Sequence, residues 1–270
     1  MPEGDTIFRA ARSVRRALDE RQIVAACGRR DVNAPAVLGA TVCGVESRGK
    51  HLLIHFDNQL VLHSHLGMTG AWHIYPRGHK WFKPREQAGI RLSTERHDVV
   101  CFTPDLLEVV DQVRIRRHPY LNRLGPDLLG PPIADDVFLT RMRSQRNAAI
   151  GEVVMNQTVV CGIGNVYKSE ILFLEHLHPR TGVSLVSDER LLLLRDRSRQ
   201  LMSRNLENGP RRTRYRPDEQ FLWVYGRRGE NCLKCGTGVR MIRQGDKARS
   251  TYFCPACQPV PQSTARRQRA

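Results

Sequence analysis

Residues 51–75 have the sequence HLLIHFDNQLVLHSHLGMTGAWHIY, and this stretch decides the fold class of the first half of the chain. It contains three runs of apolar or alternating residues, and turn-forming residues such as Asp57 and Gly67 separate them. Several short strands at such spacing favour a β-sandwich or barrel-like domain. The runs that predict strands in this half are His51–Phe56, Gln59–Leu66, Gly70–Tyr75, Gly89–Ser93 and Val99–Phe102.

Helical periodicity lies on both sides of this region. Residues 5–19 place apolar side chains on one helical face, and Asp5 is the expected N-cap. The sequence therefore predicts an α+β protein of two domains, in which a β-sandwich with a flanking N-terminal helix precedes a helical C-terminal domain. The C-terminal helices are expected at about 134–145, 148–156, 165–175 and 188–206, the last with a stripe of Leu191, Leu194, Leu201 and Met202.

The composition indicates a polyanionic partner. The 270 residues carry a formal net charge of +16, and residues 211–270 supply +10 of it with 14 Lys and Arg against 4 Asp and Glu. No apolar run is long enough to span a bilayer, and the charged residues that begin at Glu3 argue against a signal peptide. We therefore expect a cytoplasmic protein with reduced cysteines and no membrane partner.

Four cysteines near the C-terminus form two pairs, Cys232-x2-Cys235 and Cys254-x2-Cys257, with eighteen residues between the pairs. This spacing is typical of tetrahedral zinc on a β-hairpin, and four cysteine ligands make the site structural. The alternative, two disulfides, does not fit a reducing cytoplasm. We expect one structural Zn²⁺ ion. The remaining cysteines are expected to be small core residues, namely Cys27, Cys43, Cys101 and Cys161.

Three segments have residues that could bind phosphate. Gly162-Ile-Gly164-Asn165 precedes a predicted helix, whose first N–H groups could meet a phosphate, although a tight helix–helix turn explains the glycines equally well. Lys50, at the start of a strand, could pair with a phosphate or be an exposed edge charge. Arg249 lies near the expected hairpin tip and could reach a phosphate or remain solvated.

Met68 stands between two glycines at a predicted turn. It is either an ordinary core residue or an exposed apolar wedge of the kind that fills a gap in a base stack. His63, His65 and His73 suggest a second metal site, and strand alternation makes His63 and His65 neighbours on one face. Because no carboxylate has a convincing spacing to them, we expect no second metal.

Pro2-Glu3-Gly4-Asp5 follows the start methionine. If Met1 is removed, Pro2 has a free secondary amine beside the carboxylate of Glu3. An α-amino group, with a pKa of about 7.7–8.0, is unprotonated near neutral pH far more readily than a lysine at about 10.4. Such an amine can attack an electrophilic sugar carbon and hold it as an iminium ion. Met-Pro starts are common, so these residues alone do not establish catalysis.

Together these motifs resemble the formamidopyrimidine-DNA glycosylase/endonuclease VIII family over nearly the whole chain. The similar segments occur in the family's order. They are the N-terminus Pro2–Gly4, the conserved-lysine strand Gly49–Leu53, the void-filling loop His65–Gly70, the helix–two-turn–helix Asn156–Tyr167 and the zinc finger Arg249–Gln258. The resemblance implies a catalytic β-sandwich domain at 1–120, a helix–two-turn–helix DNA-binding domain at 121–215, a zinc finger at 216–260 and a basic disordered tail at 261–270.

The branch of the family is indicated by two segments. The 8-oxoguanine-directed branch has an Arg-x-Phe wedge, which the corresponding stretch Thr103–Glu108 lacks, whereas His118–Asp127 resembles endonuclease VIII. The chain therefore resembles an actinobacterial endonuclease VIII that acts on oxidised pyrimidines. It departs from the family at Thr6, where a second glutamate is common, and at Gly67-Met68-Thr69, where endonuclease VIII has Gln-Leu-Tyr. The first departure bears on the strength of base excision, and the second on the choice of opposite base.

The resemblance implies a bifunctional DNA glycosylase and abasic-site lyase that nicks DNA by β,δ-elimination. Pro2 is the implied nucleophile and Glu3 the proton shuttle. Lys50, Asn165 and Arg249 would contact phosphates near the reacting nucleotide, and Met68 would fill the space left by the flipped base. The implied partner is double-stranded DNA with oxidised bases or abasic sites, with single-stranded DNA as a further candidate. A monomer associated with the bacterial nucleoid, with zinc as its one cofactor, is expected.

Two alternatives remain open at this point. A non-catalytic or lyase-only binder of abasic or damaged DNA could use the same fold, and Thr6 favours it. An RNA-binding zinc-ribbon protein is the other alternative, because helix–two-turn–helix elements also occur in ribosomal proteins. Pro2 and Glu3 would have no purpose in a protein that only binds nucleic acid.

Overall fold

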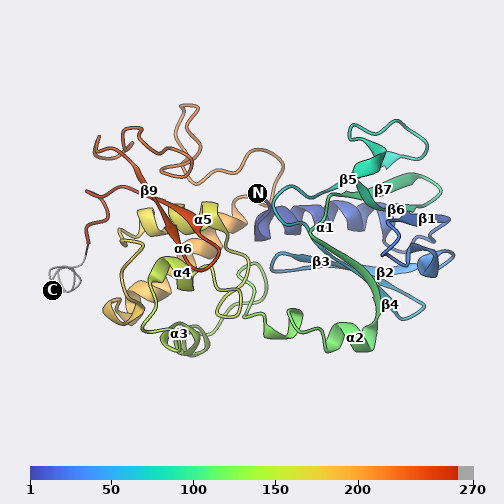
Figure 1. Cartoon of the computed structure of the whole chain (residues 1–270), viewed down its shortest axis with the longest axis horizontal. Coiled ribbons are helices and arrows are strands. Elements are labelled where there is room, and N and C mark those ends of the chain that lie inside the picture. The colour runs from blue at the N-terminus through green and yellow to red at the C-terminus, as the bar shows by residue number, and fades with distance from the viewer. Residues whose placement is uncertain (261–270) are drawn as a thin grey trace. The chain divides into compact units, whose positions relative to one another are not determined.

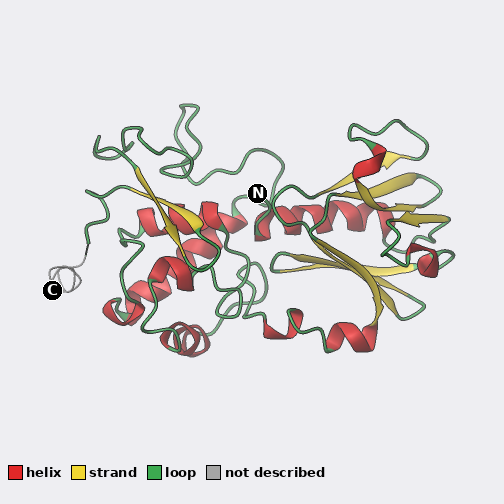
Figure 2. Ribbon diagram, viewed as in Figure 1, coloured by secondary structure: helices red, strands yellow, loops and turns green. Residues whose placement is uncertain are grey.

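The computed structural model describes residues 1–260, and the expected basic tail at 261–270 lies outside the described residues. The chain forms two compact units, Met1–Arg123 and Leu124–Ala270 (Figure 1). Strands make up most of the regular structure of the first unit, and helices that of the second (Figure 2). The predicted α+β class is confirmed.

The first unit is a sandwich of two antiparallel four-stranded sheets. One has the strand order β1-β6-β7-β5 and the other the order β2-β3-β4-β8. Every pairing in both sheets is antiparallel. The strands are β1 (Ala25–Gly28), β2 (Val42–Arg48), β3 (His51–Phe56), β4 (Leu60–His65), β5 (Ala71–Pro76), β6 (Ala88–Ser93), β7 (His97–Phe102) and β8 (Leu106–Asp111).

Helix α1 (Gly4–Leu18) completes the core of this sandwich. Its buried apolar face, which includes Ile7 and Val14, belongs to one apolar cluster with residues of both sheets. The predicted N-cap was wrong. Glu3 is the N-cap, with extended backbone at φ −128°, and Asp5 lies in the first turn. An acidic residue favours the first turn as well as the cap because the helix dipole is positive there, so this signal did not fix the boundary.

Three strands lie outside the predicted set, namely β1, β2 and β8. Exposed positions interrupt the apolar pattern of β1 and β2, which weakened their strand signal. Strand β8 begins within the stretch 103–108, so Thr103, Pro104 and Asp105 precede it and Leu106, Leu107 and Glu108 belong to it. Its pairing with β4 begins at Leu106 and places Glu108 directly opposite His63. This register brings a carboxylate to the strand that carries two of the histidines.

A helical link follows β8. Helix α2 (Gln112–Arg116) is capped by Asp111, whose carboxylate accepts the backbone N–H of Arg114 at 2.7 Å. The division between the units falls after Arg123, inside the segment 118–127 that the sequence predicts as a connection. Four short 3-10 turns complete the described helices: η1 (Ala34–Val37), η2 (Arg85–Gln87), η3 (Leu121–Arg123) and η4 (Val183–Leu185).

The second unit packs its helices around a core of its own. They are α3 (Asp135–Arg143), α4 (Ile150–Val153), α5 (Asn165–Leu174) and α6 (Asp188–Ser203). The apolar stripe predicted for α6 is buried, and Ser187 caps its start by accepting the N–H of Arg190. In the part of the chain that the structure describes, no helix is long and apolar enough to cross a membrane.

A β-hairpin packs on two of these helices. It consists of β9 (Arg240–Gln244) and β10 (Arg249–Phe253). The Gly245 N–H of its turn donates to Glu152 of α4 at 3.3 Å, and the Gln244 side chain donates to the Pro179 carbonyl oxygen at 3.1 Å. The turn that precedes Arg249 is therefore held against the helical core.

Candidate functional site

The first candidate group lies where the chain enters α1. Pro2 is half-buried and directly precedes Glu3, the N-cap of the helix. The side chain of Glu3 is 0% exposed, and so is that of Asp5. Carboxylates are stabilised at this end of a helix by the unpaired N–H groups and the positive dipole. The fold thus holds a buried acid beside the residue that would carry the amine.

Thr6 occupies the next position of α1 and is half-buried. Its hydroxyl group donates to the Asp5 carboxylate at 3.3 Å. A hydroxyl group does not ionise near neutral pH, so it cannot exchange a proton as a carboxyl group can. The start of the helix therefore has two buried carboxylates, those of Glu3 and Asp5, and a neutral hydroxyl group at Thr6.

Lys50 lies in the tight turn between β2 and β3. Gly49 has a φ of +60°, a left-handed conformation that favours glycine. This turn places half-buried Lys50 immediately before the first residue of β3. The position agrees with the strand start that the sequence predicts, and the role of Lys50 in phosphate binding stays a prediction.

Met68 is at the tip of the turn between β4 and β5 and is 65% exposed, so it is not a core residue. The turn leaves little freedom. Gly67 has a φ of +60°, and a Cβ atom there would lie 2.7 Å from Cβ of Asp105. The Gly70 N–H closes the turn onto the Leu66 carbonyl oxygen at 2.9 Å. An exposed apolar side chain on a constrained turn has the form that a wedge requires.

A hydrogen-bonded cluster of three histidines and one carboxylate lies in the same unit. One oxygen of Glu108 meets Nδ1 of His63 at 2.9 Å and Nε2 of His118 at 3.0 Å. Nε2 of His63 lies 2.8 Å from Nδ1 of His51. Burial lowers the pKa of His51 to about 3, and burial also lowers the pKa of His63 against the opposing effect of Glu108. The rings of half-buried His51 and buried His63 are therefore neutral near neutral pH.

The structure changes the expectation for the histidines. Glu108, which the sequence reasoning passed over, supplies the carboxylate, and the ligand atoms of His63, Glu108 and His118 lie within 4.8 Å of one another. These atoms already satisfy one another by hydrogen bonds. His73 lies instead on the other sheet, where its Nδ1 meets the Tyr75 hydroxyl at 3.0 Å. Predicting that residues 106–111 form a strand paired with residues 60–65 would have placed Glu108 beside the histidines.

In the second unit, Asn165 is the first residue of α5, after Gly164 as the N-cap. It is 6% exposed, and its Oδ1 atom is buried with no hydrogen-bond partner among the described residues. Leaving a buried acceptor unpaired costs about 1–3 kcal/mol. The amide nitrogen of the same side chain is a donor at the positive end of a helix, where phosphates bind.

Gln157 fixes the turn before α5. Its Oε1 accepts the Gly162 N–H at 3.0 Å, and its Nε2 donates to the carbonyl oxygens of Ile163 at 3.1 Å and Met155 at 2.8 Å. Gly162 has a φ of +111°. The side chain of Gln157 thus orders the glycine-rich turn that precedes Asn165.

Arg249 is the first residue of β10 and pairs with Gln244 across the hairpin. This position agrees with the expected hairpin tip. Arg243 donates to the Ala248 carbonyl oxygen at 3.0 Å and so braces the turn. Arg249 is half-buried. Arg249 therefore begins a strand directly after an ordered turn, and its contact with DNA stays a prediction.

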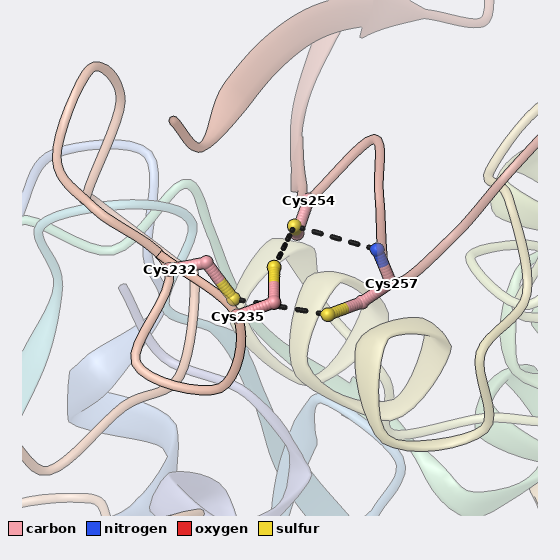
Figure 3. A group of neighbouring side chains, drawn as sticks. All are labelled: Cys232, Cys235, Cys254 and Cys257. Atoms are coloured by element: carbon pink, nitrogen blue, oxygen red, sulfur yellow. Dashed lines mark hydrogen bonds between the residues drawn. The ribbon is translucent and has the colours of Figure 1, made fainter. Parts of the chain in front are cut away.

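The four C-terminal cysteines meet at one point, with their sulfur atoms gathered between two chain loops (Figure 3). Sγ of Cys235 lies 3.4 Å from Sγ of Cys254, and Sγ of Cys232 lies 3.9 Å from Sγ of Cys257. A Zn–S bond of about 2.3 Å sets tetrahedral sulfur ligands about 3.8 Å apart. The sulfur atoms therefore fit one zinc ion, and all four positions of that ion would be filled by protein.

The other cysteines divide into two classes. Cys101 and Cys161 are buried as expected, and burial raises the pKa of the Cys101 thiol. Cys27 and Cys43 are exposed, so their assignment to the core was wrong. Both lie at exposed positions of strands β1 and β2, the two strands whose apolar pattern is interrupted.

Three family models match consecutive parts of the chain. Residues 1–115 match the formamidopyrimidine-DNA glycosylase N-terminal domain, and residues 124–216 match the formamidopyrimidine-DNA glycosylase H2TH domain. Residues 229–260 match the zinc finger found in FPG and IleRS. The H2TH match contains the turn before α5, and the zinc-finger match contains all four cysteines.

Similar proteins support the same assignment. "Probable endonuclease 8 2" of Streptomyces coelicolor is 37% identical over 97% of this chain and 95% of its own length. "DNA-(apurinic or apyrimidinic site) lyase Nei2" of Mycolicibacterium smegmatis is 37% identical over 96% of this chain and 99% of its own. The Lactococcus lactis Fpg bound to abasic-site DNA shares the fold, with a TM-score of 0.81, 21% identity and coverage of 96% of this chain and 100% of its own. The predicted resemblance is confirmed: the chain belongs to the formamidopyrimidine-DNA glycosylase/endonuclease 8 family of DNA repair enzymes, and its C-terminal hairpin is a zinc finger of that family.

Proposed function

We propose that this protein is a bifunctional base-excision-repair enzyme, a DNA glycosylase and abasic-site lyase that removes oxidised pyrimidines and nicks DNA by β,δ-elimination. The observation that carries the proposal is the start of α1, where Pro2 directly precedes the fully buried Glu3. Family membership supports the reaction class, because the relatives are named as endonuclease 8, abasic-site lyase and formamidopyrimidine-DNA glycosylase.

The preference for oxidised pyrimidines rests on two features. Residues 103–108 lack the Arg-x-Phe wedge of the 8-oxoguanine branch, and the relatives from Streptomyces and Mycobacterium are named endonuclease 8. The zinc ion would fold the hairpin that carries Arg249, and it would take no part in bond breaking. The enzyme would act as a monomer on DNA in the bacterial cytoplasm.

DNA binding in this proposal divides between the two units. Asn165 and Arg249 of the second unit, and Lys50 of the first, would contact phosphates near the damaged nucleotide. The anomeric carbon is shielded in a stacked duplex, so the nucleotide must be flipped out before attack. Exposed Met68 would occupy the vacated space and offset part of the cost of unstacking.

The chemistry begins at the amine of Pro2 once Met1 is removed. The nitrogen lone pair forms a bond to C1′ as the bond from C1′ to the base breaks. The base leaves with the electron pair of that bond, and the N–H proton of the proline amine passes to it. Glu3 would protonate O4′ as the sugar ring opens, which leaves an iminium between the proline nitrogen and C1′.

The iminium then permits strand cleavage. It acidifies the C2′–H, so loss of that proton to a base and departure of the 3′ phosphate with the C3′–O electrons is a β-elimination. A second proton loss expels the 5′ phosphate, and water releases the sugar fragment from Pro2. Glu3 is the buried acid adjacent to these steps and would move the protons between them.

Borohydride trapping tests the proposal. The full-length protein with Met1 removed is mixed with abasic-site duplex DNA and sodium borohydride, and covalent adducts are separated by denaturing electrophoresis. We expect an adduct in which Pro2 is the modified residue by mass spectrometry. A protein with a permanent N-terminal tag is the matched control and should give none. Tight binding without an adduct in the untagged protein would refute the proposal in favour of a DNA-binding protein.

A further inference from the structure

A second feature of the first unit has no role in the chemistry above. Residues 77–87, which we call the basic aromatic loop, connect β5 to β6. The loop carries four cationic side chains against one acidic side chain, together with two adjacent aromatic residues. These are Arg77, Lys80, Lys83 and Arg85, then Glu86, and Trp81 and Phe82.

The base of the loop is anchored by aromatic packing on the outer face of its sheet. Tyr75, Val100 and Phe102 form a small buried cluster, and Trp81 packs against it. The Trp81 ring stacks on Tyr75 with centroids 6.1 Å apart and meets Phe102 edge-on at 5.8 Å. Two of the cations lie over these rings, with Arg85 5.2 Å from the Trp81 centroid and Lys83 5.7 Å from the Phe102 centroid.

Phe82 stands in contrast to Trp81. Its ring is tilted against Tyr75 with centroids 5.8 Å apart, yet the side chain is 91% exposed, so most of its surface faces water. Folding gains almost nothing from a side chain in this position. Residues 78–86 line an open surface hollow of about 550 Å³.

The loop ends beside the turn that carries Met68. The Thr103 N–H donates to the Gln87 carbonyl oxygen at 2.9 Å, and the Thr103 hydroxyl group donates to the Thr69 carbonyl oxygen at 3.4 Å. In the sheet register, Ala71 and Ala88 both pair with Phe102, one from each side. The last residue of the loop is thus joined through Thr103 to the turn proposed to enter the base stack.

We propose that the basic aromatic loop binds single-stranded DNA next to the lesion, with Phe82 stacked on an unpaired base and Lys80 and Lys83 near its phosphates. An exposed aromatic ring among cations is the combination that single-strand binding proteins use, because every base has a face for stacking and phosphates are always present. This inference rests on the proposed function and deepens it. It gives the enzyme a preference for lesions with unpaired neighbours, since bases stacked within a duplex cannot reach Phe82.

Phe82→Ala is the primary test. Fluorescence anisotropy measures the affinity of the full chain for an oligothymidylate of about 20 nucleotides and for a fully paired duplex of equal length. We expect the single-strand affinity to fall about 5- to 100-fold, the effect of losing one stacked base, and the duplex affinity to fall less. Phe82→Trp should restore single-strand binding, and Leu38→Ala, at a 58% exposed site of the same unit, should leave both affinities unchanged.

The cations are tested separately by Lys83→Gln, which should reduce the salt dependence of single-strand binding by about 0.7 in the log–log slope for each lost phosphate contact. Equal affinity of Phe82→Ala and the unaltered protein for the oligothymidylate would overturn the proposal, and would leave the loop as a surface for a protein partner. Borohydride trapping on abasic duplex is read in parallel. An adduct with no single-strand defect refutes only the loop, whereas a single-strand defect with no adduct refutes only the chemistry.

Discussion

The hydroxyl group of Ser169 accepts the backbone N–H of Tyr252 at 3.1 Å and donates to the Asn165 carbonyl oxygen at 2.9 Å. One side chain therefore joins the first turn of α5 to strand β10. The two residues proposed to contact phosphates in this unit, Asn165 and Arg249, lie at the start of these two elements. Ser169 therefore links the backbone of Asn165 to the strand that begins at Arg249.

Ser169→Ala should weaken binding to abasic-site duplex by about fivefold, the effect of losing roughly 1 kcal/mol of hydrogen bonding that positions the two residues. Ser198→Ala is the matched control, because the Ser198 hydroxyl group is also buried but bonds only within α6, to Leu194 at 2.6 Å. Urea unfolding should report a similar small loss of stability for both variants. Equal DNA affinity in the two variants would show that Ser169 has no positioning role.

Glu170 anchors the chain that leads into the zinc finger. Its buried carboxylate accepts backbone N–H groups from Trp223 at 2.7 Å, Val224 at 2.9 Å and Tyr225 at 2.8 Å, together with the Thr213 hydroxyl group. Glu170→Gln replaces one acceptor oxygen with a donor that faces these N–H groups, and each unpaired buried group costs about 1–3 kcal/mol. We expect a marked loss of unfolding free energy in urea, whereas Glu152→Gln, with its single exposed contact to Gly245, should lose little.

Zinc should be present at one equivalent and should stabilise only the hairpin region. Cys254→Ser removes one thiolate, and because apparent zinc-binding energies in finger peptides are about 10–16 kcal/mol, loss of the ion should unfold the hairpin. We expect tight DNA binding to be lost while circular dichroism retains the β-sandwich and helices. Elemental analysis decides the point, since active protein without zinc would contradict a structural role.

The sequence predicted those parts of the fold that depend on local pattern. The stripe of α6 and the paired cysteines depend on fixed spacings, so both could be recognised without tertiary contacts. Glu108 could not be assigned to the histidine cluster in this way. Its place opposite His63 is a matter of register between β4 and β8, strands some forty residues apart in the chain, and no local signal specifies that pairing. The exposure of Cys27 and Cys43 was missed for the same reason, because the burial of an edge residue depends on its neighbours in space.

The histidine cluster should make the first unit sensitive to acid. The folded pKa of His51, about 3, lies below the unfolded value of about 6.5, so the unfolded ring binds a proton that the folded ring does not. The stabilising contribution is complete above about pH 6.5 and is lost as the pH falls toward 3, at up to about 1.4 kcal/mol per pH unit for one proton. His51→Gln should flatten this dependence in urea titrations between these limits. His79→Gln, at an exposed turn, should not, and an unchanged slope in His51→Gln would contradict the assignment.

Thr6 allows the two activities of the enzyme to be separated. Base excision needs a proton for the departing base, whereas an abasic site has no base left to remove. Thr6 stands in place of the family's second glutamate, and its hydroxyl group donates a hydrogen bond to Asp5. We therefore expect robust cleavage of abasic sites and weaker or narrower base excision. Thr6→Glu should raise single-turnover excision of an oxidised pyrimidine and leave abasic-site cleavage nearly unchanged. Glu3→Gln should retain DNA binding but suppress excision, since it removes the acid beside Pro2 without emptying its buried site. If Thr6→Glu slows excision instead, the hydroxyl group itself contributes to the reaction, and the missing carboxylate does not limit the rate of base excision.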